Sequence, residues 1–334
     1  VQYSVFSLPG DYSPDLISDG AGGALIAYWN GGMDVYLQRV YANGTLWNSA
    51  GTQVDYTSGL GYLSYDPAVS LDGTGGAYYA WRRNDPGTVI LVQRINAAGG
   101  RLFTSPETVS LASGTHQNPD IIGDGVGGAC VVWENDRGSG WNIYAQRLDA
   151  FGDALWETDG IPLGAAGIHQ YDPVAVSSGP SGFIAAWTGI PVGGPGYENP
   201  LYVQKIDNGG TVLWAADGLI TLDGDIASGY DFAADGSGGI VTVINKDKSL
   251  GTDSDIYAQS INAFGEPAAP EPEIIVIEDV PGDQGGWLRI TIGRSDRDHL
   301  GQVSERVTFY DIWQRVDDPP AFSPISDESD GGSG

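Results

Sequence analysis

The sequence predicts an all-β fold: a five-bladed β-propeller followed by a shorter β segment. Three observations lead to this prediction. A unit of about fifty residues recurs along most of the chain, and the copy at residues 118–163 is complete. That copy contains four short apolar runs separated by turns. The chain also holds 51 Gly, 17 Tyr and 10 Trp, a composition typical of many short strands joined by turns. Four short antiparallel strands in a repeat of this length form one propeller blade.

Each strand of the complete copy has its own signal. The first two runs flank the turn Asp124-Gly125-Val126-Gly127-Gly128, which indicates a hairpin because glycine adopts positive φ without steric cost. The third run, Asn142 to Leu148, alternates between two faces. Leu155-Trp156 begins the fourth run after a turn at Gly152.

The other copies align by their turns. The position nine residues after the turn's first residue is aromatic in four of the five copies, and a glutamine recurs in every third strand. The aromatic residues are expected to pack blade against blade, and each glutamine to bond backbone groups of neighbouring strands. The turn residues are Asp19, Asp72, Asp124, Ser178 and Asp235, and the glutamines are Gln38, Gln93, Gln146, Gln204 and Gln259.

The fifth copy stops at Gly265-Glu266-Pro267 and lacks its outer strand. Val1 precedes Pro14 by the same interval as Val54 precedes Pro67, so the N-terminal residues align with the end of an outer strand. We therefore expect Val1–Leu8 to complete the fifth blade and remove its exposed edge. A further blade upstream of Val1 is the alternative.

Charge and composition exclude several functions. The net charge of −28, with a pI near 4.1, argues against nucleic-acid binding, which needs a basic protein surface. No stretch reaches the roughly eighteen apolar residues of a membrane span. Cys130 is the single cysteine and is expected to be a buried, inert thiol. Together these features favour an extracellular or cell-surface protein.

Residues 1–267 resemble the β-propeller repeats, with a D-G-x-G-G turn and a Q-R strand, of secreted or surface-anchored bacterial multidomain proteins. Ser70-Leu71-Asp72-Gly73-Thr74 comes nearest to the Asp-box of sialidase-like propellers. Its glycine pair and aromatic positions depart from that pattern, so sialidase chemistry is not carried over.

The composition changes after the repeats. Residues 268–273 form a Pro/Glu-rich linker, expected to be extended. Residues 274–317 resemble the opening part of a fibronectin type III-like module, and residues 318–334 have the composition of a flexible tail. A half sandwich exposes a strand edge, which could pack on its own propeller or mediate self-association by strand addition.

The longest and most variable loops join the second strand to the third, and binding sites favour such loops. Aromatic rings beside planar polar groups suit a sugar; the alternative is ordinary polar loops in an acidic protein. The candidate ligand-binding residues are Tyr65, Arg82, Arg83, Asp85, Glu134, Asp136, Arg137, Trp141, Tyr197 and Lys246.

Asp66, Asn118 and Asp172 occupy one register at the start of the innermost strands, each directly before a proline. Their oxygens could face one another and bind a hard cation such as calcium. The alternative is that Asp and Asn before Pro only begin a turn. No other cofactor is expected.

The leading functional hypothesis is a non-catalytic extracellular binding or structural module that engages glycan or protein through the long-loop face, as part of a surface assembly. The alternative is a glycoside hydrolase that uses Asp66, Asp172 and Glu134 at the channel mouth as nucleophile, base or acid.

Overall fold

The protein is described here from a computed structural model. The structure describes residues 12–29, 34–48, 51–55, 63–84, 87–138, 140–164, 167–191, 199–221, 226–247, 254–267, 274–279 and 288–292. The chain divides into two compact units, Val1–Pro267 and Ala268–Gly334. Within the described residues, no helix is long and apolar enough to cross a membrane.

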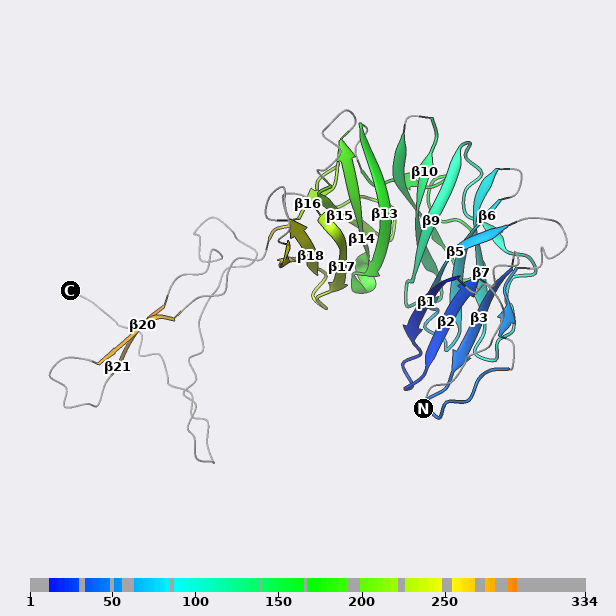
Figure 1. Cartoon of the computed structure of the whole chain (residues 1–334), viewed down its shortest axis with the longest axis horizontal. Helices are drawn as coiled ribbons and strands as arrows, with labels where there is room; N and C mark the ends of the chain where they lie inside the picture. The colour runs from blue at the N-terminus through cyan, green and yellow to red at the C-terminus, as the bar shows by residue number, and fades with distance from the viewer. Residues whose placement is uncertain are drawn as a thin grey trace. The chain divides into compact units, whose positions relative to one another are not determined.

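The first unit is a series of antiparallel sheets, which we call blades 1 to 5 (Figure 1). Blades 1 to 4 have four strands each, in sequence order, and blade 5 has three described strands. The strands are β1 (Tyr12–Ser18), β2 (Ala24–Trp29), β3 (Val35–Val40) and β4 (Thr52–Gln53); β5 (Ser64–Leu71), β6 (Ala77–Asn84), β7 (Thr88–Ile95) and β8 (Glu107–Thr108); β9 (Thr115–Gly123), β10 (Ala129–Asp136), β11 (Trp141–Leu148) and β12 (Ile161–Pro162); β13 (Ile168–Ser177), β14 (Gly182–Pro191), β15 (Leu201–Asp207) and β16 (Leu219–Ile220); and β17 (Ile226–Ala234), β18 (Ile240–Asp247) and β19 (Ser254–Ile261).

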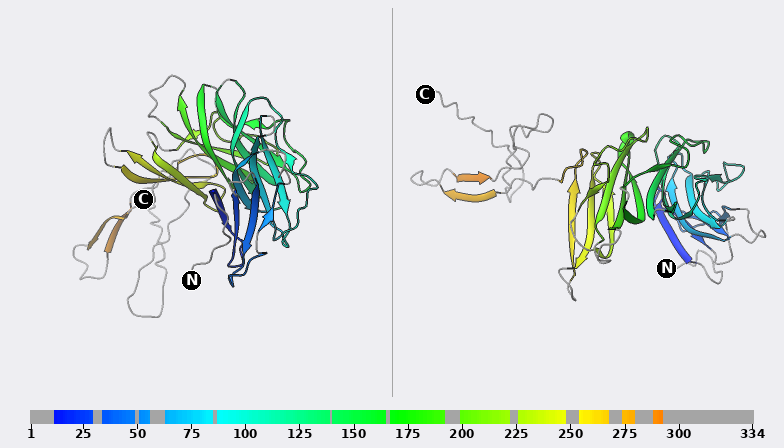
Figure 2. Two further views of the ribbon diagram at one scale, coloured as in Figure 1. Left: turned by 45° about the vertical axis from the view of Figure 1, so that its right-hand side comes forward. Right: turned by 90° about the horizontal axis from the view of Figure 1, so that it is seen from above.

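The predicted all-β, propeller-like fold is confirmed, and Figure 2 shows the successive blades from two further sides. The predicted strand at Val1–Leu8 lies outside the described residues. In the second unit, β20 (Ile274–Asp279) pairs with β21 (Leu288–Ile292). The fibronectin type III-like module at residues 274–317 therefore stays a prediction.

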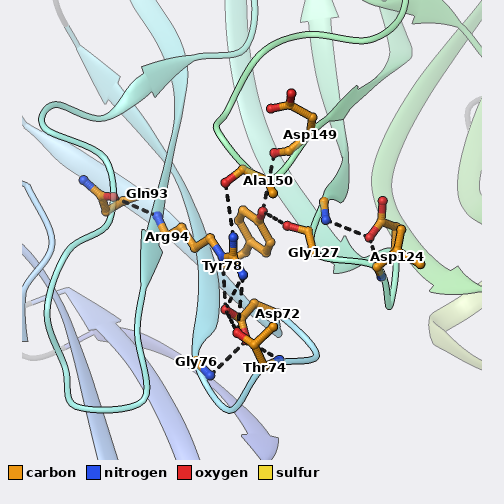
Figure 3. A network of polar contacts seen from close by, with 12 residues as sticks. Asp72, Thr74, Gly76, Tyr78, Gln93, Arg94, Asp124, Gly127, Asp149 and Ala150 are labelled. Atoms are coloured by element: carbon orange, nitrogen blue, oxygen red, sulfur yellow. Dashed lines mark hydrogen bonds and ion pairs between the residues drawn. The ribbon is translucent and has the colours of Figure 1, made fainter.

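The D-G-x-G-G turn and the Q-R strand form one polar network. In blade 2, Asp72 Oδ1 accepts hydrogen bonds from the Thr74 and Gly76 amides at 2.8 and 2.9 Å, and Asp72 Oδ2 lies 2.9 Å from Arg94 (Figure 3). Burial raises the pKa of Asp72, but hydrogen bonds from Thr74 and Arg94 outweigh it and leave the pKa below its ordinary value. The pairs Asp19–Arg39 and Asp124–Arg147 repeat this ion pair. The network thus links the first hairpin to the third strand.

The same basic side chain reaches the next blade. Arg94 donates from a second nitrogen to the Ala150 carbonyl of blade 3 at 3.2 Å, next to the hydrogen bond from Tyr78 to the Gly127 carbonyl (Figure 3). We call this cross-blade contact the basic latch. The other latches are Arg39 to Gly75, Arg147 to Asn208 and Lys205 to Gly238, at 3.3, 3.2 and 2.6 Å.

An aromatic latch lies beside the basic latch in blades 1, 3 and 4. Trp156 of blade 3 donates its indole N–H to the Asn208 carbonyl of blade 4 at 3.0 Å and lies over Gly210. Gly210 has φ +87°, and a Cβ on it would come within 3.0 Å of the Trp156 ring. Trp47 and Trp214 make the equivalent hydrogen bonds to Ala97 and Ala263, at 3.1 and 3.2 Å.

The repeated glutamines join strands within a blade. Gln146 accepts from the Arg147 and Trp156 amides and donates to the Glu157 carbonyl at 2.8 Å. Gln38, Gln93 and Gln204 make the same kind of bonds. The prediction that these glutamines bond backbone groups is confirmed for these four copies.

Each blade has a leading face, directed toward the next blade, and a trailing face, directed toward the previous one. The leading residues Tyr78, Ala80 and Ile90 of blade 2 pack on Val131 and Trp133 of the trailing face of blade 3. Four buried clusters of this kind join consecutive blades from 1 to 5. Cys130 is buried in one of them, as predicted. Within the described residues, no buried cluster joins blade 5 to blade 1.

Carboxylates also join the innermost strands. Asp15 of blade 1 accepts from the Val69 amide of blade 2 at 2.9 Å, and Asp120 of blade 3 accepts from the Ala175 amide of blade 4 at 2.7 Å. Burial raises the pKa of Asp120 to about 7. The charge of Asp15 also raises this pKa, whereas the hydrogen bonds from the Ala175 and Ile121 amides lower it.

The aromatic latch gives a first prediction. Gly210→Ala should destabilise the fold by about 2–4 kcal/mol, because a positive φ costs an L-residue about 1–2 kcal/mol and the methyl group also overlaps Trp156. Gly236→Ala is the matched control: Gly236 has φ +79° but nothing within 4 Å of its Cβ position. Urea unfolding measures both variants, and an equal loss in the two would contradict the role of the latch.

Asp120 gives a second prediction. Because the folded chain binds this proton more tightly than the unfolded chain, its stabilising contribution is full below about pH 4 and is lost as the pH rises toward 7. Urea unfolding from about pH 4 to pH 8 should show a steeper fall for the wild type than for Asp120→Asn. Asp207→Asn, in a hairpin turn, controls for the lost charge. Parallel curves for wild type and Asp120→Asn would refute the assignment.

Candidate functional site

The start of each innermost strand is irregular in the same way in blades 2, 3 and 4. In β5 the pairing jumps from Tyr65 to Ala68, which leaves Asp66 and Pro67 opposite the single residue Trp81. The pairs Asn118-Pro119 and Asp172-Pro173 lie opposite Trp133 and Trp187 in the same way. Two residues against one is a β-bulge, and proline fits there because it has no N–H to donate.

The residue before each of these prolines has an unusual backbone conformation. Asp66, Asn118 and Asp172 have φ of 52°, 47° and 53°, in the left-handed region. This conformation costs an L-residue about 1–3 kcal/mol and persists only where the surroundings hold it. Such strain concentrates at functional sites. Three neighbouring blades therefore share one strained position, occupied each time by a residue with a side-chain oxygen.

Glu134, on β10, holds two of these positions together. Its Oε1 accepts from the Asn118 side-chain amide and from the Asp172 backbone N–H, both at 2.7 Å. Its Oε2 accepts from the Gln117 side chain at 2.7 Å. The residue is completely buried, and burial raises the pKa of Glu134, opposed by these hydrogen bonds. Glu134 thus links the Asn118 side chain in blade 3 to the Asp172 backbone in blade 4.

Asp172 is held from the other side by blade 5. The Tyr230 hydroxyl donates to the Asp172 carbonyl and lies 3.2 Å from the Ala186 carbonyl. Burial, with the charges of Asp172, Asp120 and Glu134, raises the pKa of Tyr230, so the phenol stays protonated and able to donate. Because both peptide groups of Asp172 are anchored, its backbone is fixed while the residue itself is exposed.

In blade 2 the equivalent residue has a cationic partner. Arg82 Nε lies 3.2 Å from Asp66 Oδ2, with 30% of the Asp66 side chain exposed. The Arg82 guanidinium lies over the Tyr65 ring, 4.8 Å from its centroid, and Tyr65 contacts Trp29 at a centroid distance of 5.2 Å. An acid, a cation and two aromatic rings therefore meet here.

Other predicted ligand-binding residues have contacts within the protein. Arg83 lies 3.6 Å from the buried Asp55. Arg137 lies over the Tyr144 ring at 3.6 Å and donates to the Asp159 carbonyl. Asp136 accepts from the Gly138 amide in its own loop.

The structure describes the remaining predicted ligand-binding residues only in part. Trp141 is half-buried at the start of β11, where its backbone N–H faces His169 Nδ1 at 3.3 Å. Lys246 pairs with Ile226 through the backbone of β18, and its side chain is outside the description. Asp85 and Tyr197 lie outside the described residues.

Gln117 and Tyr230 belong to the site but are not among the residues predicted from the sequence. Gln117 directly precedes the conspicuous Asn118, so only the contact with Glu134 distinguishes it. Tyr230 stands where the other copies have proline. This replacement is the sequence feature that could have identified Tyr230 as a site residue.

The described residues contain no group of three or more His, Cys, Asp or Glu side chains arranged to hold a metal ion. Calcium at Asp66, Asn118 and Asp172 stays a prediction. Because Glu134 binds the Asn118 amide nitrogen, the amide oxygen of Asn118 is directed away from Glu134.

Comparison with known proteins shows a similarity in fold. No family model and no curated protein sequence matches the chain. A Hadza microbial sialidase matches in structure with a TM-score of 0.52 and 13% identity, over 78% of this chain. The chain spans 57% of the sialidase's length. An alpha-L-arabinanase from Penicillium chrysogenum has a TM-score of 0.44 and 14% identity, over 86% of this chain and 90% of the arabinanase.

These matches correct the leading functional hypothesis. The solved structures that resemble the chain include a glycan-processing enzyme, the sialidase. The hypothesis of a non-catalytic module is therefore contradicted, and the hydrolase alternative fits better. At such low identity the likeness shows the fold alone, so the chemistry has to be argued from the residues of this chain.

Proposed function

We propose that the protein is a glycoside hydrolase whose site lies at the strained bulges of blades 2, 3 and 4. The observation that supports this most directly is Asp172, an exposed carboxylate on a left-handed backbone anchored by Glu134 and Tyr230. Hydrolysis of a glycosidic bond needs two carboxyl groups on rigid supports. Asp66 occupies the same register in blade 2 and is the second accessible carboxyl.

The roles follow from exposure and contacts. Asp172 acts as the nucleophile or base, because its exposed side chain can reach a sugar. Asp66 is the partner acid, and Arg82 beside it binds hydroxyl or acidic groups of the substrate. Glu134 is completely buried and accepts three hydrogen bonds, so it positions Asn118 and Asp172 without contacting the sugar. Tyr65 offers a ring face on which a sugar can stack.

The setting of the enzyme belongs to the same proposal. The acidic chain, with its net charge of −28, suits work outside the cell or at its surface on a glycan substrate. Calcium would bind through the oxygens of Asp66, Asn118 and Asp172, and activity with and without a chelator tests this. A fibronectin type III-like module at residues 274–317, with self-association through that segment, and closure of blade 5 by Val1–Leu8 complete the proposal.

The test begins with hydrolysis of arabinan, xylan, sialylated glycans and aryl glycosides by the full chain. Asp172→Asn and Asp66→Asn should each lower kcat by about a hundredfold to ten-thousandfold, because an essential carboxyl group is lost. Glu134→Gln should cost less, about tenfold to a hundredfold, because it displaces Asp172 by turning an amide N–H toward existing donors. Reducing-sugar release and chromophore release measure these rates.

Asp207→Asn is the matched control, since Asp207 caps a hairpin turn through the Gly209 and Thr211 amides and should keep full activity. Absence of hydrolysis across the whole panel, or an Asp172→Asn variant with unchanged kcat, would refute the proposal. Circular dichroism checks that each variant is folded.

A further inference from the structure

A cavity of about 420 Å³ lies at the junction of blades 2 and 3. Its walls come from the residues after β7 in blade 2 and from the β11–β12 hairpin of blade 3, and they include Leu102, Thr104, Ser105, Glu107, Ala150 and Phe151. In blade 3, β10 runs from Ala129, which pairs with Leu148 just before this hairpin, to Glu134 beside the bulge. The cavity and the candidate active site therefore lie at opposite ends of the blade.

One replacement in the repeat distinguishes this junction. The Phe103 amide donates to Gln93 Oε1 at 3.0 Å, and the amides of Trp47, Trp156 and Trp214 make the same bond to the glutamines of their own blades. Phe103 therefore occupies the position of the aromatic latch, but its ring is smaller than an indole and has no N–H. The cavity, which Phe103 also lines, lies where the indole of the other blades is missing.

The same replacement leaves a backbone carbonyl with an unused acceptor position. In blade 4 the Asn208 carbonyl accepts from both Arg147 and Trp156, at 3.2 and 3.0 Å. The equivalent Ala150 carbonyl of blade 3 accepts from Arg94 at 3.2 Å (Figure 3), and no second residue in the described part of the chain donates to it. A carbonyl oxygen has two lone pairs, so Ala150 can accept one more hydrogen bond from a ligand.

Glu107 is a second acceptor in the cavity. Its side chain is half-buried, and no described residue donates a hydrogen bond to its carboxylate. Gly152 makes room for it, because this glycine has φ +94° and a Cβ on it would lie 2.6 Å from Glu107 Cγ. Burial, together with the charge of Asp153, raises the pKa of Glu107. A ligand hydroxyl that donates to this carboxylate would offset part of the cost of its burial.

The apolar part of the cavity wall is exposed to solvent. Phe151 is 79% exposed and Leu102 is 48% exposed. A sugar ring can stack its apolar face on an aromatic ring while its hydroxyls donate to nearby oxygens. An aromatic or aliphatic ligand would cover Phe151 as well, but it would leave the Glu107 carboxylate and the Ala150 carbonyl unpaired, which is unfavourable. The combination of ring and acceptors therefore favours a sugar.

The charges around the cavity select among sugars. Arg94 is the basic residue of the lining, and its three guanidinium nitrogens are already engaged: Nε and Nη2 bind Asp72, and Nη1 donates to the Ala150 carbonyl. Glu107 and Asp153 make the surroundings negative. An anionic sugar would meet these carboxylates without a cation to balance it, so a neutral sugar fits best.

We propose that this cavity is a second glycan-binding site, which holds a neutral sugar of a polysaccharide with its ring on Phe151 and its hydroxyls on Glu107 and the Ala150 carbonyl. The site is separate from the strained bulges, because the two lie at opposite ends of blade 3. The inference goes beyond the proposed hydrolase and does not depend on it. In a hydrolase, such a site keeps the polymer bound while the carboxylates act elsewhere on it.

The test is electrophoresis of the full chain in native gels that contain a neutral polysaccharide, with arabinan, xylan and starch as separate probes. At least one of them should retard the wild type. Phe151→Ala should raise the dissociation constant about tenfold or more, because the stacking surface is lost. Phe103→Trp should weaken binding as much, because the indole then fills the cavity and donates to the Ala150 carbonyl. Urea unfolding should show that Phe103→Trp is as stable as the wild type or more stable.

Phe264→Ala is the matched control. Phe264 is 59% exposed at the same hairpin position of blade 5, where Trp214 forms the aromatic latch, so this variant should be retarded like the wild type. Polygalacturonate, an anionic polymer, should not retard the chain through this site. The gel measures binding alone, so a chain without hydrolase activity leaves this test intact.

Several results would overturn the proposal. A wild type that no neutral probe retards excludes it. Retardation that is unchanged in both Phe151→Ala and Phe103→Trp places the binding elsewhere, as at the bulges. An equal loss in Phe264→Ala indicates unspecific adhesion of exposed rings. Binding of N-acetyltryptophanamide in place of the polysaccharides, lost in Phe103→Trp, would identify the cavity as a site for an aromatic side chain. Circular dichroism checks that each variant is folded.

Discussion

A four-stranded blade has two apolar faces and cannot cover either by itself. The structure depends on this constraint, because each blade is stable only while its neighbours cover it. Trp81, Trp133 and Trp187 are completely buried at the junctions with the preceding blades. The turn carboxylates, the basic latches and the aromatic latches all fix the orientation of one blade on the next. The glycine that receives each tryptophan follows from the same requirement, since a side chain there would push the blades apart.

The candidate site depends on that packing as well. Asp172 belongs to blade 4, but its backbone is held by a carboxylate from blade 3 and a phenol from blade 5. No single blade could keep the residue in its left-handed conformation, because the strain needs partners on both sides. Burial of Glu134 is tolerated because three donors satisfy its two oxygens. Weakening the packing of blade 3, 4 or 5 would therefore also loosen the exposed Asp172 carboxylate.

The three acidic residues of the candidate site differ in their surroundings. In the sequence, Asp66, Asp172 and Glu134 are three acids among many in a strongly acidic chain, which favoured a binding module. In the structure they differ in kind: Asp172 is exposed on a strained backbone, Asp66 is paired with Arg82, and Glu134 is a buried anchor. This division of roles is compatible with the proposed hydrolase.

The sequence by itself determined the repeat, the strand order within each blade, the buried tryptophans and the roles of the glutamines, because each depends on local periodicity and turn chemistry. It also identified Asp66, Asn118 and Asp172 as one register. The tertiary structure decided that this register is a strained bulge, that Glu134 and Tyr230 anchor Asp172, and that Arg83 and Arg137 are engaged within the protein. These properties arise where separate blades meet, and spacing within one repeat carries no information about such contacts.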